Sequence, residues 1–316
     1  MDARKRHLQK ACAKLTLDAD VADQRDLEIT IAYGKLKLCG LEKTASTFMK
    51  AIRAKEKGLQ KEQPFKSFII VREPYGRLLS GYIDKLFSRA TWWDMYGKYI
   101  VEHFRYRPKK KEVNCGSNVT FHEFIKYWFN AYETGNKEDG HFRPMHKTCR
   151  MCYFDYDYYV RLETIGSDMT YIYQQINMTL DRQMSDDEMT IKDKAADIIN
   201  QRDKGGWQGC ESACSMLKRT WWSFHARGLV AMDVEMPVKE EECETISRHD
   251  FVKLAHQSHL ESKARIDKPK QRWKSMVDYY LQIPLVDRLK IRDILMKDFK
   301  LHGYDPTPRD MFPELH

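Results

Sequence analysis

The stretch Lys35–Phe48 reads KLKLCGLEKTASTF and passes from a strand pattern to a helix pattern. Apolar and polar residues alternate over Lys35–Cys39, which predicts a strand, and the run Met49–Ile52 continues as a helix. The turn between them clusters one lysine with three hydroxyls. Backbone N–H groups at a helix start converge on an anion, and the helix dipole favours negative charge there. The stretch therefore predicts an anion-binding turn, with an ordinary capped helix start as the alternative.

A second strand pattern follows at Phe68–Val71, which reads FIIV, and Pro74 then stands at a natural first helical position. Apolar residues recur at helical spacing over Leu78–Phe87. Strand, helix and strand in this order predict a parallel βαβ unit, and hence an α/β fold with a central parallel sheet flanked by helices. Because ligands collect beyond the carboxyl ends of parallel strands, Arg72 and the Lys43 turn should face one crevice.

The remaining chain gives a coarser organisation. Residues 1–30 are interpreted as a polar helical lead-in and residues 31–316 as a single domain. Residues 91–118 are interpreted as an irregular basic surface segment, followed by a short helix at Phe121–Phe129 with Thr120 as its N-cap. A further amphipathic helix is expected at Leu285–Leu301, before Gly303.

The charge balance favours a polyanionic partner. The chain of 316 residues carries 54 basic and 46 acidic side chains, a formal net charge of +8. Nucleic acid, an acidic glycan and a phosphorylated cofactor all fit such a balance. No apolar run approaches the ~18–20 residues that span a bilayer, and no signal peptide is visible, so we expect any membrane anchor to lie outside this chain.

The cysteines allow two interpretations. Two N-x-T sequons, at Asn118 and Asn177, are compatible with passage through an oxidising secretory lumen, although the even count of eight cysteines does not fix the redox compartment in a chain of this length. A zinc site is the alternative, because four good ligands stand within twelve residues: His141, His146, Cys149 and Cys152.

Three blocks together resemble one family. The Lys43 turn and VREPYGRLLSGY (Val71–Tyr82) resemble the 5′-phosphosulfate loop and the 3′-phosphate element of sulfotransferases that use 3′-phosphoadenosine 5′-phosphosulfate (PAPS). The longer stretch to Phe87 and the block His141–Thr164 are similar to Golgi carbohydrate sulfotransferases of the chondroitin/dermatan 4-O-sulfotransferase type. Residues 200–280 match poorly, and we expect a family-divergent insertion there.

The resemblance implies a P-loop-like sulfotransferase fold and transfer of a sulfuryl group from PAPS to a hydroxyl of a chondroitin/dermatan-type glycosaminoglycan, without a metal. Lys43 would stabilise the leaving group. His141 is the expected general base, with Glu163 as its rival. Contacts with PAPS are expected from Lys43, Thr44, Ala45, Ser46, Thr47, Phe48, Arg72, Arg77 and Ser80.

The resemblance also implies an acidic glycan partner, N-glycans at Asn118 and Asn177, disulfides that involve Cys149 and Cys152, and residence in the Golgi lumen. Two other functions stay open: a catalytically degenerate relative that binds sulfated glycans, and a zinc-containing nucleic-acid-binding protein. Contacts with the acceptor are expected from Arg105, Arg107, Lys109, Lys110, Lys111 and Arg161.

Overall fold

The computed structural model describes residues 1–15, 28–55, 66–149, 151–178, 186–207 and 209–316. The chain divides into two compact units, each assembled from separate stretches of sequence. The first unit comprises Met1–Leu78, Glu138–Gln183 and Pro284–His316, and the second comprises Leu79–Lys137 and Met184–Ile283. The boundaries of a helical lead-in at residues 1–30 and a single domain at residues 31–316 stay a prediction.

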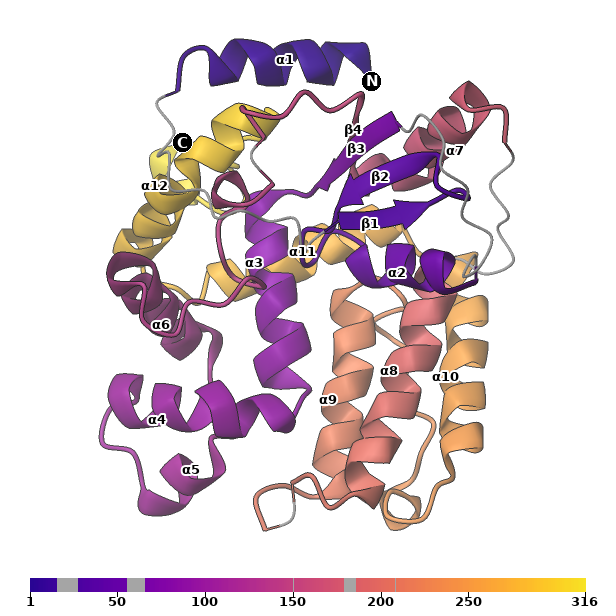
Figure 1. Ribbon diagram of the computed structural model, residues 1–316. Coiled ribbons are helices and arrows are strands. Elements are labelled where there is room, and N and C mark those ends of the chain that lie inside the picture. Colours follow the sequence, from indigo (N-terminus) through magenta and orange to yellow (C-terminus); the bar gives the residue numbers. More distant parts are fainter. Residues whose placement is uncertain (16–27, 56–65, 150, 179–185, 208) are drawn as a thin grey trace. The chain divides into compact units, whose positions relative to one another are not determined.

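A four-stranded sheet in the order β1-β2-β3-β4 forms the centre of the first unit (Figure 1). Strands β2, β3 and β4 run parallel to their neighbours, whereas β1 is antiparallel to β2. This confirms the expected α/β fold and adds an edge strand at the end of the segment taken as a helical lead-in. The strands are β1 (Glu28–Ile31), β2 (Leu36–Cys39), β3 (Lys66–Val71) and β4 (Tyr158–Arg161).

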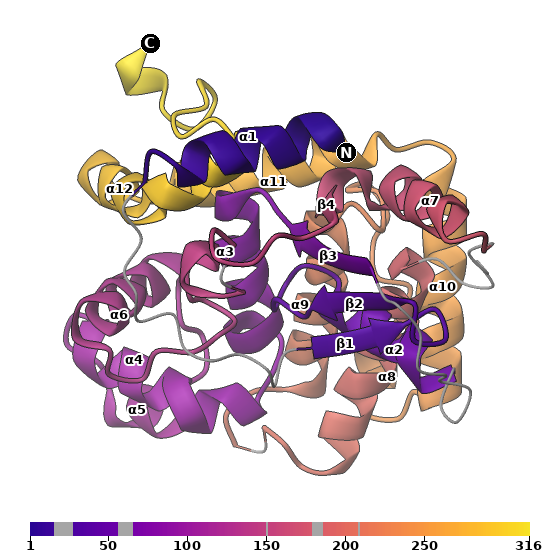
Figure 2. The same cartoon turned by 45° about the horizontal axis from the view of Figure 1, so that its top comes forward.

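Helices cover both faces of this sheet (Figure 2). On one face, α2 (Ser46–Lys55) and α7 (Ile165–Gln175) pack against side chains such as Phe68. On the other face, α1 (Asp2–Cys12) and α12 (Leu285–His302) pack against side chains such as Ile69. Burial on both faces explains why β3 has a continuous apolar run and not an alternating pattern.

Helix α3 (Pro74–Tyr82) leaves the carboxyl end of β3, and Pro74 occupies its first turn as expected. The boundary between the two units falls inside this helix, after Leu78. Two π-helical segments follow in the second unit, η2 (Ile83–Phe87) and η3 (Trp93–Gly97).

The second unit is helical in its described part. Helices α8, α9 and α10 lie side by side and share a core that includes Ile198, Phe224 and Phe251 (Figure 1). Its helices are α4 (Lys98–Phe104), α5 (Lys110–Cys115), α6 (Phe121–Thr134), α8 (Asp186–Asp203), α9 (Ala213–Ala226), α10 (Arg248–Lys263) and α11 (Lys268–Tyr280).

Two predictions from the sequence can be compared with the structure of this unit. The N-cap of α6 is confirmed, because the Thr120 hydroxyl accepts a hydrogen bond from the Glu123 N–H at 3.2 Å. The irregular segment expected at residues 91–118 is wrong, because most of these residues belong to η3, α4 and α5. The poorly matching residues 200–280 contain the end of α8 and all of α9, α10 and α11.

All eight cysteines form disulfides. The first unit contains Cys12–Cys152 and Cys39–Cys149. The second contains Cys115–Cys210 and Cys214–Cys243. The disulfide expectation is confirmed, and the zinc alternative loses both of its cysteine ligands. Within the described ranges, no group of three His, Cys, Asp or Glu side chains is arranged to hold a metal ion.

No helix in the described part of the chain combines the length and the apolar character needed to cross a membrane.

Candidate functional site

The turn between β2 and α2 has an unusual backbone. Lys43 and Ala45 both have positive φ, 66° and 64°, which non-glycine residues seldom adopt. Turns of this kind can direct successive backbone N–H groups towards one point and so bind anions. The buried Thr44 hydroxyl donates to the Leu41 carbonyl at 2.9 Å, so it braces the turn from within. The side chains of Ser46 and Thr47 lie outside the described residues, and Phe48 packs on the sheet core.

Arg72 lies at the carboxyl end of β3, next to this turn. Its Nη1 donates to the Lys43 carbonyl at 3.3 Å. Strands β2 and β3 are parallel neighbours, so their carboxyl ends meet at the same edge of the sheet, where α/β proteins bind ligands. The structure therefore brings the cation of residue 72 to the turn that carries Lys43.

Arg77 is buried in the first turns of α3 and joins the Lys43 turn to a distant segment. Its Nε donates to the Glu42 carbonyl at 3.1 Å. Its Nη1 donates to the Arg143 carbonyl at 2.6 Å, and its Nη2 to the Gly140 carbonyl at 3.1 Å. The three bonds fasten the residue before Lys43 to both sides of His141. The Arg77 guanidinium, expected to contact PAPS, thus donates to three backbone carbonyls.

His141 is half-buried and held by a neighbouring carboxylate. Its Nδ1 lies 2.6 Å from Asp139 Oδ1, and the same oxygen accepts the His141 backbone N–H at 2.8 Å. In the tautomer whose Nδ1–H donates to Asp139, Nε2 is the nitrogen that can accept a proton. The sequence interpretation missed Asp139, although an aspartate two residues before a candidate base was a usable signal.

His146, a candidate ligand in the zinc alternative, is buried on Asp298 of α12. Its Nδ1 lies 2.8 Å from Asp298 Oδ1, and the Asp298 carboxylate also accepts the backbone N–H groups of Met145 and His146. Burial would raise the pKa of Asp298, but His146 and these hydrogen bonds outweigh it and lower the pKa. This cluster holds the segment before Cys149 against α12.

Glu163, the rival base, lies just beyond β4. Its Oε1 accepts the Glu73 backbone N–H at 2.9 Å, and its Oε2 accepts the Tyr304 hydroxyl at 2.8 Å. Arg161, at the end of β4, donates to the His302 carbonyl and lies 4.7 Å from the centre of the Tyr304 ring. Both residues are therefore engaged with the segment that follows α12.

Glu73, which sequence reasoning did not single out, caps α3. Its carboxylate accepts the backbone N–H groups of Tyr75 and Gly76. Burial raises the pKa of Glu73 to about 7, against these two bonds and the nearby Arg72, while the Glu163 carboxylate adds to the rise. A carboxyl group that titrates near neutral pH thus lies beside Arg72.

The basic segment Arg105–Lys111 belongs to the second unit. Arg105 is mostly buried and forms a two-pronged ion pair with Glu123, at 2.7 and 2.9 Å, and a third contact with Glu112 at 3.2 Å. The other expected acceptor contacts of this segment are exposed: Arg107, Lys109, Lys110 and Lys111. Arg105 thus stabilises the fold through these ion pairs, whereas the other four cations have exposed side chains.

Three further candidates are placed as follows. Ser80 is buried in the part of α3 that belongs to the second unit. Asn118 is exposed, and its Oδ1 accepts a hydrogen bond from Arg219. Asn177 is exposed just after α7, and its sequon partner Thr179 lies outside the described residues.

A model of the sulfotransferase family matches residues 40–203, which is 164 of the 316 residues and includes the Lys43 turn, Arg72 and His141. The chain belongs to the sulfotransferase family.

Individual sulfotransferases match over shorter segments. Carbohydrate sulfotransferase 14 of Danio rerio is 32% identical over 109 residues, 34% of this chain and 29% of that protein. Carbohydrate sulfotransferase 9 of Homo sapiens is 30% identical over 109 residues, 34% of this chain and 24% of that protein. Carbohydrate sulfotransferase 14 of Homo sapiens is 30% identical over 129 residues, 41% of this chain and 33% of that protein.

These matches confirm the resemblance to carbohydrate sulfotransferases. The aligned segments span only about a quarter to a third of the relatives' own lengths. No solved structure matches this sulfotransferase.

Proposed function

We propose that this sulfotransferase transfers a sulfuryl group from PAPS to a hydroxyl of a glycan, of the chondroitin or dermatan type. The observation that supports this proposal most directly is a set of three hydrogen bonds from the Arg77 guanidinium. They join the carbonyl of Glu42, the residue before Lys43, to the carbonyls of Gly140 and Arg143 on the two sides of His141. A cationic turn and a histidine base are thereby fixed on one framework. The names of the relatives support a carbohydrate acceptor.

The donor groups at the sheet edge fit an anionic ligand such as PAPS, which supplies the sulfuryl group when it is bound. The positive-φ backbone at Lys43 and Ala45, with the N-terminus of α2, favours negative charge. The Lys43 ammonium would neutralise charge on the leaving oxygen, and Arg72 would hold the 3′-phosphate. We assign Thr44 and Arg77 to holding the turn in shape, since their donors already bind carbonyls.

His141 is the base of this proposal. The Asp139 carboxylate orients the imidazole and would stabilise the imidazolium that forms when Nε2 takes the acceptor proton. Glu163 is a poorer candidate because both of its oxygens accept hydrogen bonds from Glu73 and Tyr304. We therefore assign Glu163 to positioning the loop after β4.

We also propose that the exposed cations Arg107, Lys109, Lys110 and Lys111 contact an acidic glycan, while Arg105 and Arg161 act within the fold. Four disulfides and exposed asparagines at both sequons favour the Golgi lumen, with N-glycans at Asn118 and Asn177.

Binding and turnover test the proposal separately. Adenosine 3′,5′-bisphosphate should raise the melting temperature of the protein and of Lys50→Ala, a control on the exposed side of α2, but not of Lys43→Ala or Arg72→Ala. The wild type should transfer labelled sulfate from PAPS to desulfated chondroitin.

His141→Ala should keep the rise in melting temperature with the nucleotide but lose sulfate transfer. Asp139→Asn should also keep the rise in melting temperature and should lose part of the sulfate-transfer activity. A nucleotide that binds without any sulfate transfer to a broad glycan panel would favour the degenerate glycan-binding alternative. A protein that binds no nucleotide would reject the donor assignment.

A further inference from the structure

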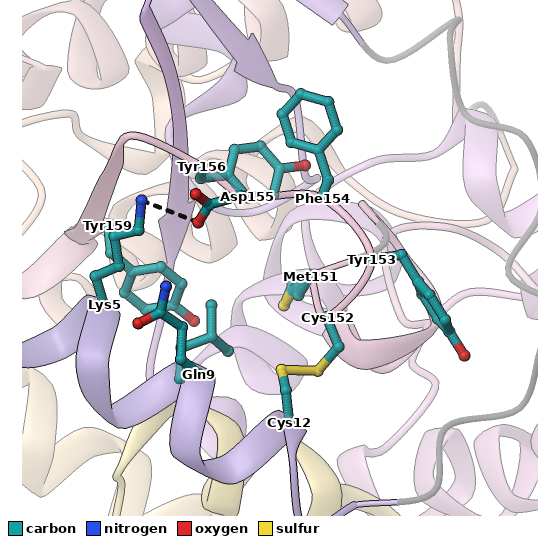
Figure 3. A pocket seen from close by; sticks show the side chains of 11 residues that line it. Lys5, Gln9, Cys12, Met151, Cys152, Tyr153, Phe154, Asp155, Tyr156 and Tyr159 are labelled. Carbon is teal, nitrogen blue, oxygen red and sulfur yellow. Dashed lines mark ion pairs between the residues drawn. A yellow bond between two sulfur atoms is a disulfide. The ribbon is translucent and has the colours of Figure 1, made fainter.

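A pocket of about 280 Å³ lies between α1 and the segment Met151–Tyr156, within the first unit. Figure 3 shows Lys5 and Gln9 of α1 facing this segment, with Tyr159 of β4 beside them. The Lys5–Asp155 ion pair, 2.9 Å long, lies at one end, and the Cys12–Cys152 disulfide lies at the other. None of these side chains has a role in the proposed sulfuryl transfer.

The lining combines aromatic rings with a few polar groups. Tyr153 and Phe154 are 60% and 50% exposed, and the Phe154 ring lies 4.9 Å from the ring of Tyr156. The amide of Gln9 is exposed at the same pocket. Sugars have apolar C–H faces that pack on aromatic rings and hydroxyl edges that bind amides and carboxylates. The pocket therefore has the chemistry of a sugar site.

The charges of the lining select among sugars. Lys5 and Asp155 are the charged residues of the lining, and they neutralise each other. A uronate or a sulfate ester would have to displace Asp155 from Lys5. A neutral sugar meets no such cost, and the Asp155 carboxylate, 74% exposed, can still accept from hydroxyls.

The wall of the pocket is fixed in place. Cys152 is bonded to Cys12 of α1, and the Tyr156 hydroxyl donates to the Cys149 carbonyl at 2.7 Å. Cys149 is in turn bonded to Cys39, four residues before Lys43. A preformed wall reduces the ordering cost of binding. The volume of the pocket, about 280 Å³, is close to the lower limit of the range for ligand sites, which is roughly 300–1,000 Å³. A pocket of this size suits a small ligand.

The pocket also lies near the sheet edge that carries the proposed active site. Tyr159 pairs with Ile69 in the parallel ladder, and Arg161 ends β4 two residues later. Two residues of a strand span about 7 Å, and both side chains lie on the same face. In chondroitin a glucuronate separates successive N-acetylgalactosamine residues, so a glycan whose reacting sugar is at the edge could reach the pocket with the next neutral residue of its chain.

We propose that this pocket is a second subsite, which binds a neutral sugar residue of the acceptor glycan near the residue that is sulfated. The inference rests on the proposed function for the identity of the glycan. Binding itself can be measured without turnover.

Saturation-transfer NMR on the full chain tests binding, with methyl β-N-acetylgalactosaminide and methyl β-glucuronide as probes. The neutral glycoside should give a signal that Gln9→Ala and Phe154→Ala remove. The matched controls on α7, Gln174→Ala and Tyr171→Ala, should keep it. Gln9 is exposed, so its variant carries the test if Phe154→Ala melts early. A glucuronide signal that the two pocket variants remove, or a neutral-sugar signal that both variants leave unreduced, would overturn the proposal.

Steady-state kinetics tests the link to the acceptor. For a desulfated chondroitin hexasaccharide, the double variant Gln9→Ala/Phe154→Ala should raise KM about fivefold and leave kcat unchanged, with no effect on a disaccharide. An active enzyme whose KM does not change in this variant would refute the subsite alone. If the protein transfers no sulfate but binds the neutral sugar, and the pocket variants remove this binding, the subsite would be supported and the proposed function rejected.

Discussion

The Lys43 turn and the basic segment Arg105–Lys111 both concentrate cations, but the structure holds them differently. In the turn, two residues with positive φ surround Thr44, and Arg72 binds the Lys43 carbonyl. In the basic segment, two glutamates neutralise Arg105, and the remaining cations lie on the surface of the second unit. The proposed donor site therefore depends on the shape of the backbone at the Lys43 turn, and not on a run of positive charge alone.

The largest contrast is expected in catalysis. Lys43→Ala should lower kcat by about 10²–10³-fold, because a preorganised donor at the developing charge is lost. The triple variant Lys109→Ala/Lys110→Ala/Lys111→Ala should change kcat less than tenfold and act on KM for acidic glycans, more strongly at low salt. Sulfate-transfer kinetics at two ionic strengths measures both. Equal losses of kcat in the two variants would abolish the distinction.

The next largest effect is expected in stability, when the hydrogen bonds between Arg77 and the Lys43 turn are removed. Arg77→Met keeps most of the volume but leaves the carbonyls of Glu42, Gly140 and Arg143 without their donor, at a cost of about 3 kcal/mol in unfolding free energy. Urea unfolding measures it, with Arg309→Met on the exposed surface as the control. A variant as stable as the control would show that the guanidinium does not hold these segments together.

A smaller loss is expected when Arg105 is replaced. Arg105→Ala should cost about 1–2 kcal/mol, because Glu123 loses its paired cation, whereas Lys110→Ala should stay within about 0.5 kcal/mol. The ion pair lowers the pKa of Glu123, although burial opposes it, so the stabilisation is present near neutral pH and lost in acid. The difference in unfolding free energy between the wild type and Arg105→Ala should therefore shrink as the pH falls below 4.5, through the lowered pKa of Glu123. A difference that stays constant down to about pH 2 would contradict this.

The last expected effect is a pH dependence of the stability, at the carboxyl end of β3 in the first unit. Burial raises the pKa of Glu73 to about 7, so the folded state favours the protonated carboxyl. The stability from this group is full below the ordinary pKa of about 4.5 and is lost as the pH rises through 7. Melting temperatures between pH 5 and pH 8 should fall less in Glu73→Gln than in the wild type or in Glu241→Gln. Identical slopes in all three proteins would exclude the titration.

Local sequence patterns predicted the strands and the helix cap whose formation depends on residues close in sequence. The alternation before Cys39, the apolar run of β3 and the N-cap Thr120 each specify an element within a few residues. The approach of Arg72 to Lys43 also followed from the sequence, because adjacent parallel strands end at the same edge.

Contacts made to backbone atoms or across long separations could not be predicted in this way. The acceptors of Arg77 are carbonyls, which every residue carries, so no residue type signals them. The helices α4 and α5 lack a clear apolar stripe and depend on their tertiary neighbours. The partner of His146 is Asp298, 152 residues later, and only the folded chain shows the pair.

The discontinuous first unit constrains how the chain matures during translation. Asp298 receives the N–H groups of Met145 and His146, and Leu301 completes the core on one face of the sheet. The ribosome makes both residues after the whole of the second unit, which ends at Ile283. The helical unit can thus fold on a nascent chain while the sheet still lacks one covering helix. Premature termination within α12 would leave that apolar face open to chaperones and proteases.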